Sequence, residues 1–215
     1  MIRTAHEIAC RALVHGALGF RASLEMTRHP KCDQACLSLL PWLQEVGLAS
    51  SITDFQREIL NCHHGKLSLE AQTEAFWRGE SAALLAWSIQ LFDSLDPVAT
   101  VDPNSLVDCL RILKPEAGEL IEGASLRPSH ELQSFCIFCI AVRNRFQLAQ
   151  LGARNRLLFD AICKTRLEEL GLHRDNEAWE RILEETTQFA AVTPNSKGLY
   201  VVRALAAEWL LGGED

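Results

Sequence analysis

One segment constrains the fold more than any other, because it is apolar on two opposite sides. Between Ser68 and Asp93, small and large apolar residues recur at steps of three and four along one helical face: Ala71, Ala75, Ala82, Leu85, Ile89 and Phe92. The opposite face carries Leu84, Trp87 and Leu91. A helix that is apolar on both sides has to pack on both sides. The sequence therefore predicts a central buried helix over about residues 68–93.

The rest of the chain has the same periodicity, which is typical of helices rather than strands. Helices are expected near residues 9–24, 36–46, 54–59, 104–113, 115–123, 129–145, 157–170, 177–190 and 197–211. Thr53 and Gln56 fit a capping box, and Ser68 fits an N-cap of the central helix. We expect an all-α fold. Its 215 residues are expected to form a single helical domain, with possible halves at 1–125 and 128–215.

Two charged residues fall on the apolar faces of the central segment. Arg78 lies in the middle of one face, and Glu80 lies on the other, so both are predicted to be buried. A buried charge without a partner is costly. Glu74 precedes Arg78 by four residues, the spacing of a structural ion pair within a helix. Glu80 needs a donor from elsewhere, and Arg143, which shares a helical face with Cys136, is one candidate.

The overall charge excludes some classes of partner. The chain has 28 acidic and 21 basic residues, a net charge of −7, which disfavours a broad nucleic-acid surface or docking on an anionic membrane. Its longest apolar run, residues 135–142, is far shorter than the ~20 residues of a membrane helix. The N-terminus lacks a secretory-signal pattern. We therefore expect a cytoplasmic protein whose eight cysteines are reduced.

The basic residues are clustered in one stretch. Arg143, Arg145, Arg154 and Arg156 form two Arg-Asn-Arg copies eleven residues apart, close to a common face on a continuous helix. The guanidinium group binds carboxylate and phosphate with two hydrogen bonds. Solvated helix ends are one interpretation of this cluster, and a site for an anion or an acidic partner is the other.

The cysteines and histidines suggest a weak metal hypothesis. His29, Cys32 and Cys36 lie near one expected loop, and Cys62, His63 and His64 form another. Their spacings match no standard zinc module. We therefore favour no metal site, and no motif in the sequence calls for a cofactor.

A resemblance to a known family is carried by the run from Ala75 to Ser88. Trp77, Arg78, Glu80 and Trp87 match the central Trp-Arg-x-Glu signature of the bacterial family catalogued as domain of unknown function 4272. An Arg-Ala-Leu element at residues 11–13, and Trp-Leu followed by Gly-Leu at residues 42–48, are also similar. The resemblance covers about residues 8–150. It implies a mostly helical, uncharacterised bacterial protein and implies no reaction.

Three functions remain open from the sequence. The leading hypothesis is a non-enzymatic interaction or scaffold module with a protein partner or a small anionic ligand, possibly as a homo-oligomer. The second is a ligand-binding protein or enzyme with a polar cleft around Arg78, Glu80 and Arg143. The third is a metal-binding protein that uses the cysteines and histidines named above.

Overall fold

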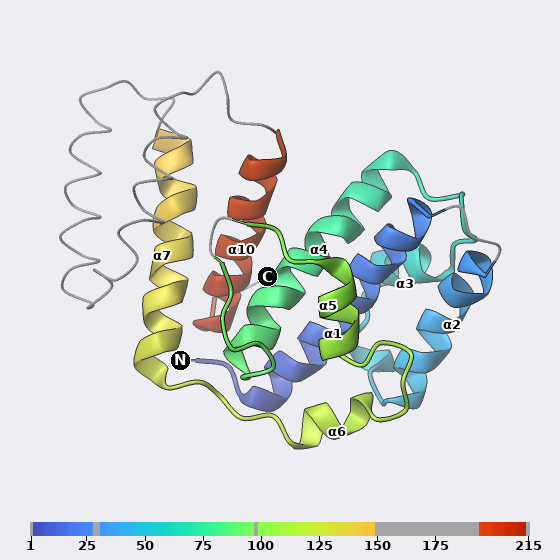
Figure 1. Ribbon diagram of the computed structural model, residues 1–215, viewed down its shortest axis with the longest axis horizontal. Helices are drawn as coiled ribbons and strands as arrows, with labels where there is room; N and C mark the ends of the chain where they lie inside the picture. The colour runs from blue at the N-terminus through green and yellow to red at the C-terminus, as the bar shows by residue number, and fades with distance from the viewer. Residues whose placement is uncertain (1, 28–30, 97–98, 149–193, 214–215) are drawn as a thin grey trace. The chain divides into compact units, whose positions relative to one another are not determined.

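A computed structural model describes residues 2–27, 31–96, 99–148 and 194–213, and all the regular elements among them are helices (Figure 1). The predicted all-α fold is confirmed. The helices expected near 157–170 and 177–190 lie outside the described residues. The described elements are α1 (Ala5–Glu25), α2 (Cys32–Glu45), the short 3-10 helix η1 (Ala49–Ser51), α3 (Asp54–Asn61), α4 (Leu69–Ser88), α5 (Pro103–Cys109), α6 (Ala117–Glu122), α7 (Ser129–Leu148) and α10 (Pro194–Leu210).

The helices belong to two compact units, which we describe separately. The N-terminal unit consists of residues 2–95 and 101–127 and contains α1 to α6. The C-terminal unit includes residues 96–100 and 128–215 and contains α7 and α10. No described helix is long and apolar enough to cross a membrane.

Several helices begin where side chains satisfy their first amides. Thr53 accepts a hydrogen bond from the amide of Gln56, whose side chain binds the Thr53 amide in return, so the predicted capping box is confirmed. Ser68 accepts from the amide of Ala71 at the start of α4, as predicted. Such caps each contribute about 1 kcal/mol to helix stability.

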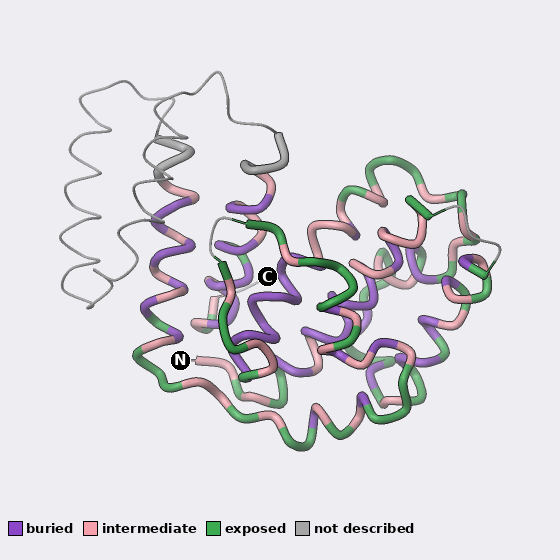
Figure 2. The backbone as a smooth tube through the Cα atoms, in the orientation of Figure 1, coloured by how far each residue is buried: buried purple, intermediate pink, exposed green. Residues whose placement is uncertain are grey.

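The helix α4 is the buried centre of the N-terminal unit. Every residue from Gly79 to Ser88 is buried, which Figure 2 shows as a continuous purple stretch. Its most extensive partner is α1, which runs antiparallel to it, since His15 lies opposite Ser81 and Gly19 lies opposite Gly79. The prediction of a central helix is therefore confirmed.

The backbones of α1 and α4 touch where they cross. A Cβ atom added to Gly19 would lie 2.6 Å from the Cα atom and 3.0 Å from the nitrogen of Gly79. These distances are shorter than van der Waals contact between carbon atoms. Only a pair of glycines permits the two helices to approach this closely.

The central helix ends five residues earlier than the apolar pattern indicated, at Ser88 instead of Asp93. Gln90 has a positive φ of 66°, which breaks the helix. The Arg127 guanidinium then holds the following segment, because it donates to the carbonyl groups of Trp87 (2.7 Å), Phe92 and Asp93 (3.0 Å). It also stacks 4.8 Å from the Trp87 ring centroid. Apolar periodicity therefore continues through a segment that is not helical.

In the C-terminal unit, α7 packs on α10, and a buried arginine binds an irregular segment. Arg203 of α10 donates to the carbonyl groups of Asp96 and Ala99 (2.8 Å for the second). Cys136 and Cys139 of α7 are buried, and burial raises the pKa of the Cys139 thiol to about 12. These thiols stay protonated and pack as small apolar groups.

Candidate functional site

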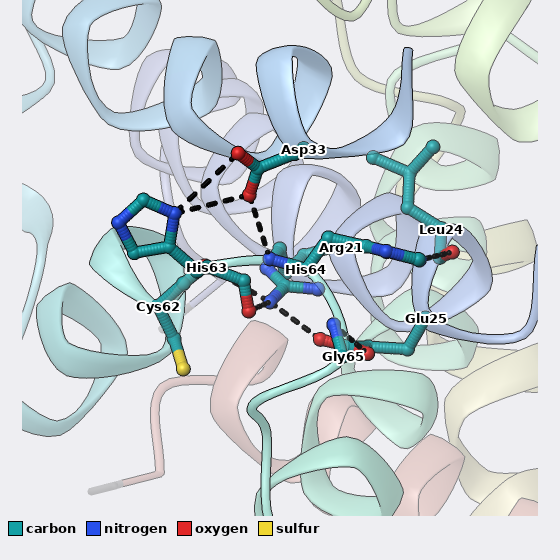
Figure 3. A network of polar contacts seen from close by, with 8 residues as sticks. All are labelled: Arg21, Leu24, Glu25, Asp33, Cys62, His63, His64 and Gly65. Carbon is teal, nitrogen blue, oxygen red and sulfur yellow. Dashed lines mark hydrogen bonds and ion pairs between the residues drawn. The ribbon is translucent and has the colours of Figure 1, made fainter. Parts of the chain in front are cut away.

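A buried arginine organises the loop that joins α3 to α4. Arg21 of α1 is fully buried, and its Nη2 atom donates to the Glu25 carboxylate (2.6 Å) and to the carbonyl groups of Cys62 (3.0 Å) and His63 (3.2 Å) (Figure 3). One guanidinium thus joins helix α1 to a loop that lies 41 residues further along the chain. Hydrogen bonds that involve a charged group are about twice as strong as neutral ones.

Two carboxylates bind the amide groups of the same loop. The amide of Gly65 donates to Glu25 (2.7 Å), and the amide of His64 donates to Asp33 at the start of α2 (3.0 Å). Burial raises the pKa of Glu25, but the hydrogen bonds from Arg21 and Gly65 outweigh it and hold this pKa below its ordinary value. The His64 amide lowers the pKa of Asp33. Both carboxylates are therefore ionised and bound at neutral pH.

The two histidines of the loop face opposite environments. His64 is half-buried, and its Nε2 atom lies 2.9 Å from the Leu24 carbonyl oxygen, so this nitrogen carries the proton and donates. His63 is exposed, and its Nδ1 atom lies 3.1 Å from the Asp33 carboxylate. Figure 3 shows the other ring nitrogen of His63 pointing away from the network. His63 is thus held in one orientation at the surface.

A tight turn completes the loop. The amide of Lys66 donates to the His63 carbonyl (3.1 Å), and Gly65 between them has a φ of 75°, a left-handed conformation that favours glycine. The loop from Cys62 to Lys66 is therefore fixed by its own turn, by α1 and by α2. Rigid support of this kind is typical of loops that carry binding residues.

The weak metal candidates are only partly brought together by this network. Cys32 and Cys36 are buried on α2, Cys62 is half-buried, and burial raises the pKa of Cys36. His29 lies outside the described residues. Within the described ranges, no three His, Cys, Asp or Glu side chains are placed to hold a metal ion.

The charged residues of the central helix have different environments. The Arg78 side chain is 37% exposed and its Nη2 atom lies 2.6 Å from Glu74, so the prediction that Arg78 is buried is wrong. Its side chain is instead half-buried beside Glu74 of the same helix. Glu80 is buried, and its carboxylate accepts from the amide of Val101 (2.9 Å), just before α5.

The candidate anion site in the second half of the chain contains one described side chain. Arg143 is paired with Glu208 of α10 by two hydrogen bonds of 2.6 Å each. The side chain of Arg145, and Arg154 and Arg156 entirely, lie outside the described part. The cleft proposed around Arg78, Glu80 and Arg143 therefore has an existing partner for each of its charges: Glu74, the Val101 amide and Glu208.

The residues that organise the loop, Arg21, Glu25 and Asp33, were not singled out by the sequence. A signal for Arg21 is nevertheless present. It follows Ala17 by four residues and so continues the apolar face of α1, with Glu25 one turn further on. The same pattern led to the prediction that Arg78 is buried. It gives no indication that the loop 41 residues away supplies the remaining acceptors.

The α1–α4 interface predicts a pH-dependent stability. His15 is buried with its Nδ1 atom 2.9 Å from the Ser81 hydroxyl oxygen, and burial, reinforced by the positive charges of Arg11 and Arg78, lowers its pKa well below 6.5. The unfolded chain therefore binds a proton below about pH 6.5 that the folded chain excludes. We expect the free energy of unfolding to fall as the pH drops from 7 to 5.

The measurement is urea unfolding of the parent and of His15→Asn at several pH values. For one excluded proton, the parent should lose up to about 1.4 kcal/mol per pH unit more than the variant. Asparagine retains a polar group near Ser81 and cannot titrate. The contributions of all other titrating groups therefore cancel when the free energies of unfolding of the two proteins are subtracted at each pH. Parallel stability curves for the two proteins would show that His15 does not exclude the proton.

Comparison with known proteins places the chain in a family. The family model described as "Domain of unknown function (DUF4272)" matches residues 1–136, more than half of the chain. This match spans α1 to α6 and the beginning of α7, including Trp77, Arg78, Glu80 and the loop held by Arg21. No curated protein and no solved structure matches the chain significantly. The chain therefore belongs to the domain of unknown function 4272 family.

Proposed function

We propose that this chain is a non-enzymatic interaction module whose contact surface is the end of the N-terminal unit that carries the loop 62–66. We call this the loop-end surface and define it by Met26, Leu37, Leu69 and the loop itself. The observation that supports it most directly is that three large apolar side chains remain exposed there, at 62%, 39% and 80% respectively.

Each of these apolar residues lies within four residues of a member of the network. Met26 directly follows Glu25, which binds the Gly65 amide. Leu37 lies one helical turn after Asp33, which binds the His64 amide, and so shares its face of α2. Leu69 begins α4, four residues after Gly65. The network thus ties the three segments that carry these apolar side chains to one loop.

Single exposed apolar residues are ordinary on protein surfaces, whereas grouped ones mark interaction sites. Four main-chain groups of this loop are already bound: Arg21 donates to two of its carbonyls, and Glu25 and Asp33 each accept from one of its amides. A preorganised loop loses little conformational entropy when a partner binds. An apolar centre beside fixed polar groups is the usual composition of a protein–protein interface.

The test uses a photo-crosslinking amino acid in place of Leu69, with Leu205 as the matched control, because Leu205 is a 54% exposed leucine of the C-terminal unit. After irradiation in the native cells, we expect discrete adducts from position 69 and none from position 205. The adduct should be lost when Leu37→Glu is added, while the thermal melt of the purified variant stays unchanged.

The identified partner is then purified and its affinity measured with the parent chain. Leu37→Glu should raise the Kd by about tenfold or more, as expected for a charge placed within an apolar contact. Equal adducts from positions 69 and 205, or a Kd unaffected by Leu37→Glu, would rule out the loop-end surface as the interface.

A further inference from the structure

We propose that His63 is a recognition residue of the loop-end surface, whose Nε2 atom accepts a hydrogen bond from a hydroxyl, amide or ammonium group of the partner. This inference rests on the proposed function and names the chemistry of one contact within that surface. It is carried by the contact between the His63 Nδ1 atom and the Asp33 carboxylate (3.1 Å), because this contact decides which ring nitrogen holds the proton.

The proton of the neutral His63 ring lies on Nδ1. The Asp33 carboxylate is ionised at neutral pH, since the hydrogen bond from the His64 amide (3.0 Å) holds the pKa of this carboxyl below its ordinary value. An ionised carboxylate can only accept hydrogen bonds, so the ring nitrogen that faces it has to donate. A neutral imidazole carries a single N–H group, and Nε2 therefore keeps a lone pair.

This lone pair is accessible and held in one direction. The His63 side chain is 67% exposed, and Figure 3 shows its second ring nitrogen directed away from the network. The Asp33 oxygens fix the ring from the other side, at 3.1 and 3.4 Å from Nδ1. An acceptor that is already oriented loses little conformational entropy when a partner donates to it.

The loop does not depend on this side chain for its own structure. The main chain of His63 is held through its carbonyl group, which accepts from Arg21 (3.2 Å) and from the Lys66 amide (3.1 Å). The side-chain contact with Asp33 is open to solvent on both sides, at 67% and 50% exposure, and exposed pairs of this kind contribute little to stability. The fixed orientation of the ring therefore serves a contact at the surface more than it serves the fold.

The same geometry disfavours an anionic group opposite Nε2. An ionised carboxylate or phosphate has no proton to donate, and it would meet the lone pair of the neutral ring with the negative charge of Asp33 directly behind. Lys66 and Glu70 are exposed charges of opposite sign, so their sum does not offset Asp33. A donor is complementary instead, because a carboxylate on one nitrogen of an imidazole makes the other nitrogen more basic.

The first measurement locates the His63 proton from the 15N chemical shifts of the ring in the full chain. The His63 signals are identified by their loss in His63→Gln, and titration of the same sample finds the pH range in which the ring is neutral. We expect the proton on Nδ1. Asp33→Asn should shift it toward Nε2, because the asparagine amide can donate to Nδ1 while its oxygen still accepts from the His64 amide.

Asp54→Asn is the matched control for this measurement. Asp54 is an exposed aspartate at the start of α3, and its replacement should leave the position of the His63 proton unchanged. A neutral parent ring that is protonated on Nε2 overturns the inference. A proton position that does not respond to Asp33→Asn overturns it as well, since Asp33 would then not set the tautomer.

The second measurement uses the protein recovered from the adducts of position 69 as the probe. Glutamine places its amide oxygen close to the position of Nε2, whereas the shorter asparagine reaches only the position of Nδ1. His63→Gln should therefore keep the Kd within about threefold of the parent value. His63→Asn should raise the Kd by about tenfold, the effect of losing one hydrogen bond. The thermal melts of both variants should match that of the parent.

Loss of this contact and loss of the whole surface give different results. A probe protein that binds His63→Asn as tightly as the parent, or His63→Gln no better than His63→Asn, retires the contact at Nε2 and leaves the loop-end surface in place. A lowered melting temperature of His63→Asn would assign the ring a structural role and also retires the contact. If position 69 gives no specific adduct, the loop-end surface is ruled out and the role of His63 with it.

Discussion

Replacing Arg21 by methionine should destabilise the chain by about 3–5 kcal/mol, the typical cost of removing one member of a buried ion pair. Methionine retains most of the side-chain length and cannot donate a hydrogen bond. The Glu25 carboxylate, whose side chain is 6% exposed, would lose the guanidinium that lies 2.6 Å away. The carbonyl groups of Cys62 and His63 would lose their donor as well. Urea unfolding monitored by circular dichroism measures the change.

The second variant in this test removes the carboxylate charge as well. In Arg21→Met/Glu25→Gln, the glutamine oxygen can still accept from the Gly65 amide, and no charge is left buried. We expect this double variant to be more stable than Arg21→Met alone, because the largest part of the cost is the stranded charge. Hydrogen exchange at the amides of His64 and Gly65 should quicken in Arg21→Met. An Arg21→Met protein as stable as the parent would contradict the role given to this arginine.

The contrast between Arg21 and Arg78 shows which features of the site can be predicted from the periodicity of the sequence. Both arginines continue an apolar helical face and both have a glutamate one turn away. Arg21 is fully buried because a loop lies over it, whereas the Arg78 side chain is 37% exposed and pairs with Glu74 of its own helix. Periodicity identifies the face on which a residue lies. Which segments cover that face is decided by contacts between residues far apart in the chain.

The same distinction explains which elements of the fold were predictable. The capping box at Thr53 and the N-cap at Ser68 involve neighbours three residues away, so local sequence is sufficient to predict them. The end of α4 at Ser88 was not predictable in this way. It depends on Arg127, which binds carbonyl groups 34 to 40 residues earlier, and the apolar pattern continues past it because Ile89 is also buried.

The loop site was missed for a related reason. His63 and Cys62 were candidate metal ligands because of their residue types. Their structural role instead uses main-chain atoms, since Arg21 binds the carbonyl groups of both residues. Carbonyl and amide groups are present at every position, so residue type carries no information about them. The contact between Gly19 and Gly79 is likewise invisible until α1 and α4 are known to be neighbours.

Replacing Gly19 by alanine should destabilise the chain by about 1–3 kcal/mol, the usual cost of overpacking a core. The new methyl carbon would lie 2.6 Å from the Gly79 Cα atom, and backbone atoms cannot rotate out of the way as a side chain can. The helices α1 and α4 would have to separate along the interface that also holds the His15–Ser81 contact. Urea unfolding again supplies the measurement.

Two further glycine-to-alanine variants isolate the effect of the crossing from the effect of the substitution. Gly118 lies in α6 with open space around its Cβ position, so Gly118→Ala should be neutral or stabilising by up to about 1 kcal/mol through helix propensity. A Cβ atom on Gly79 would lie 3.3 Å from the Gly19 Cα atom, a milder overlap, so Gly79→Ala should fall between the other two. This order follows from the asymmetry of the crossing, in which the Cβ position of Gly19 is directed at the opposing backbone more closely than that of Gly79. If Gly19→Ala were no more destabilising than Gly118→Ala, the close contact between the two helix backbones would be refuted.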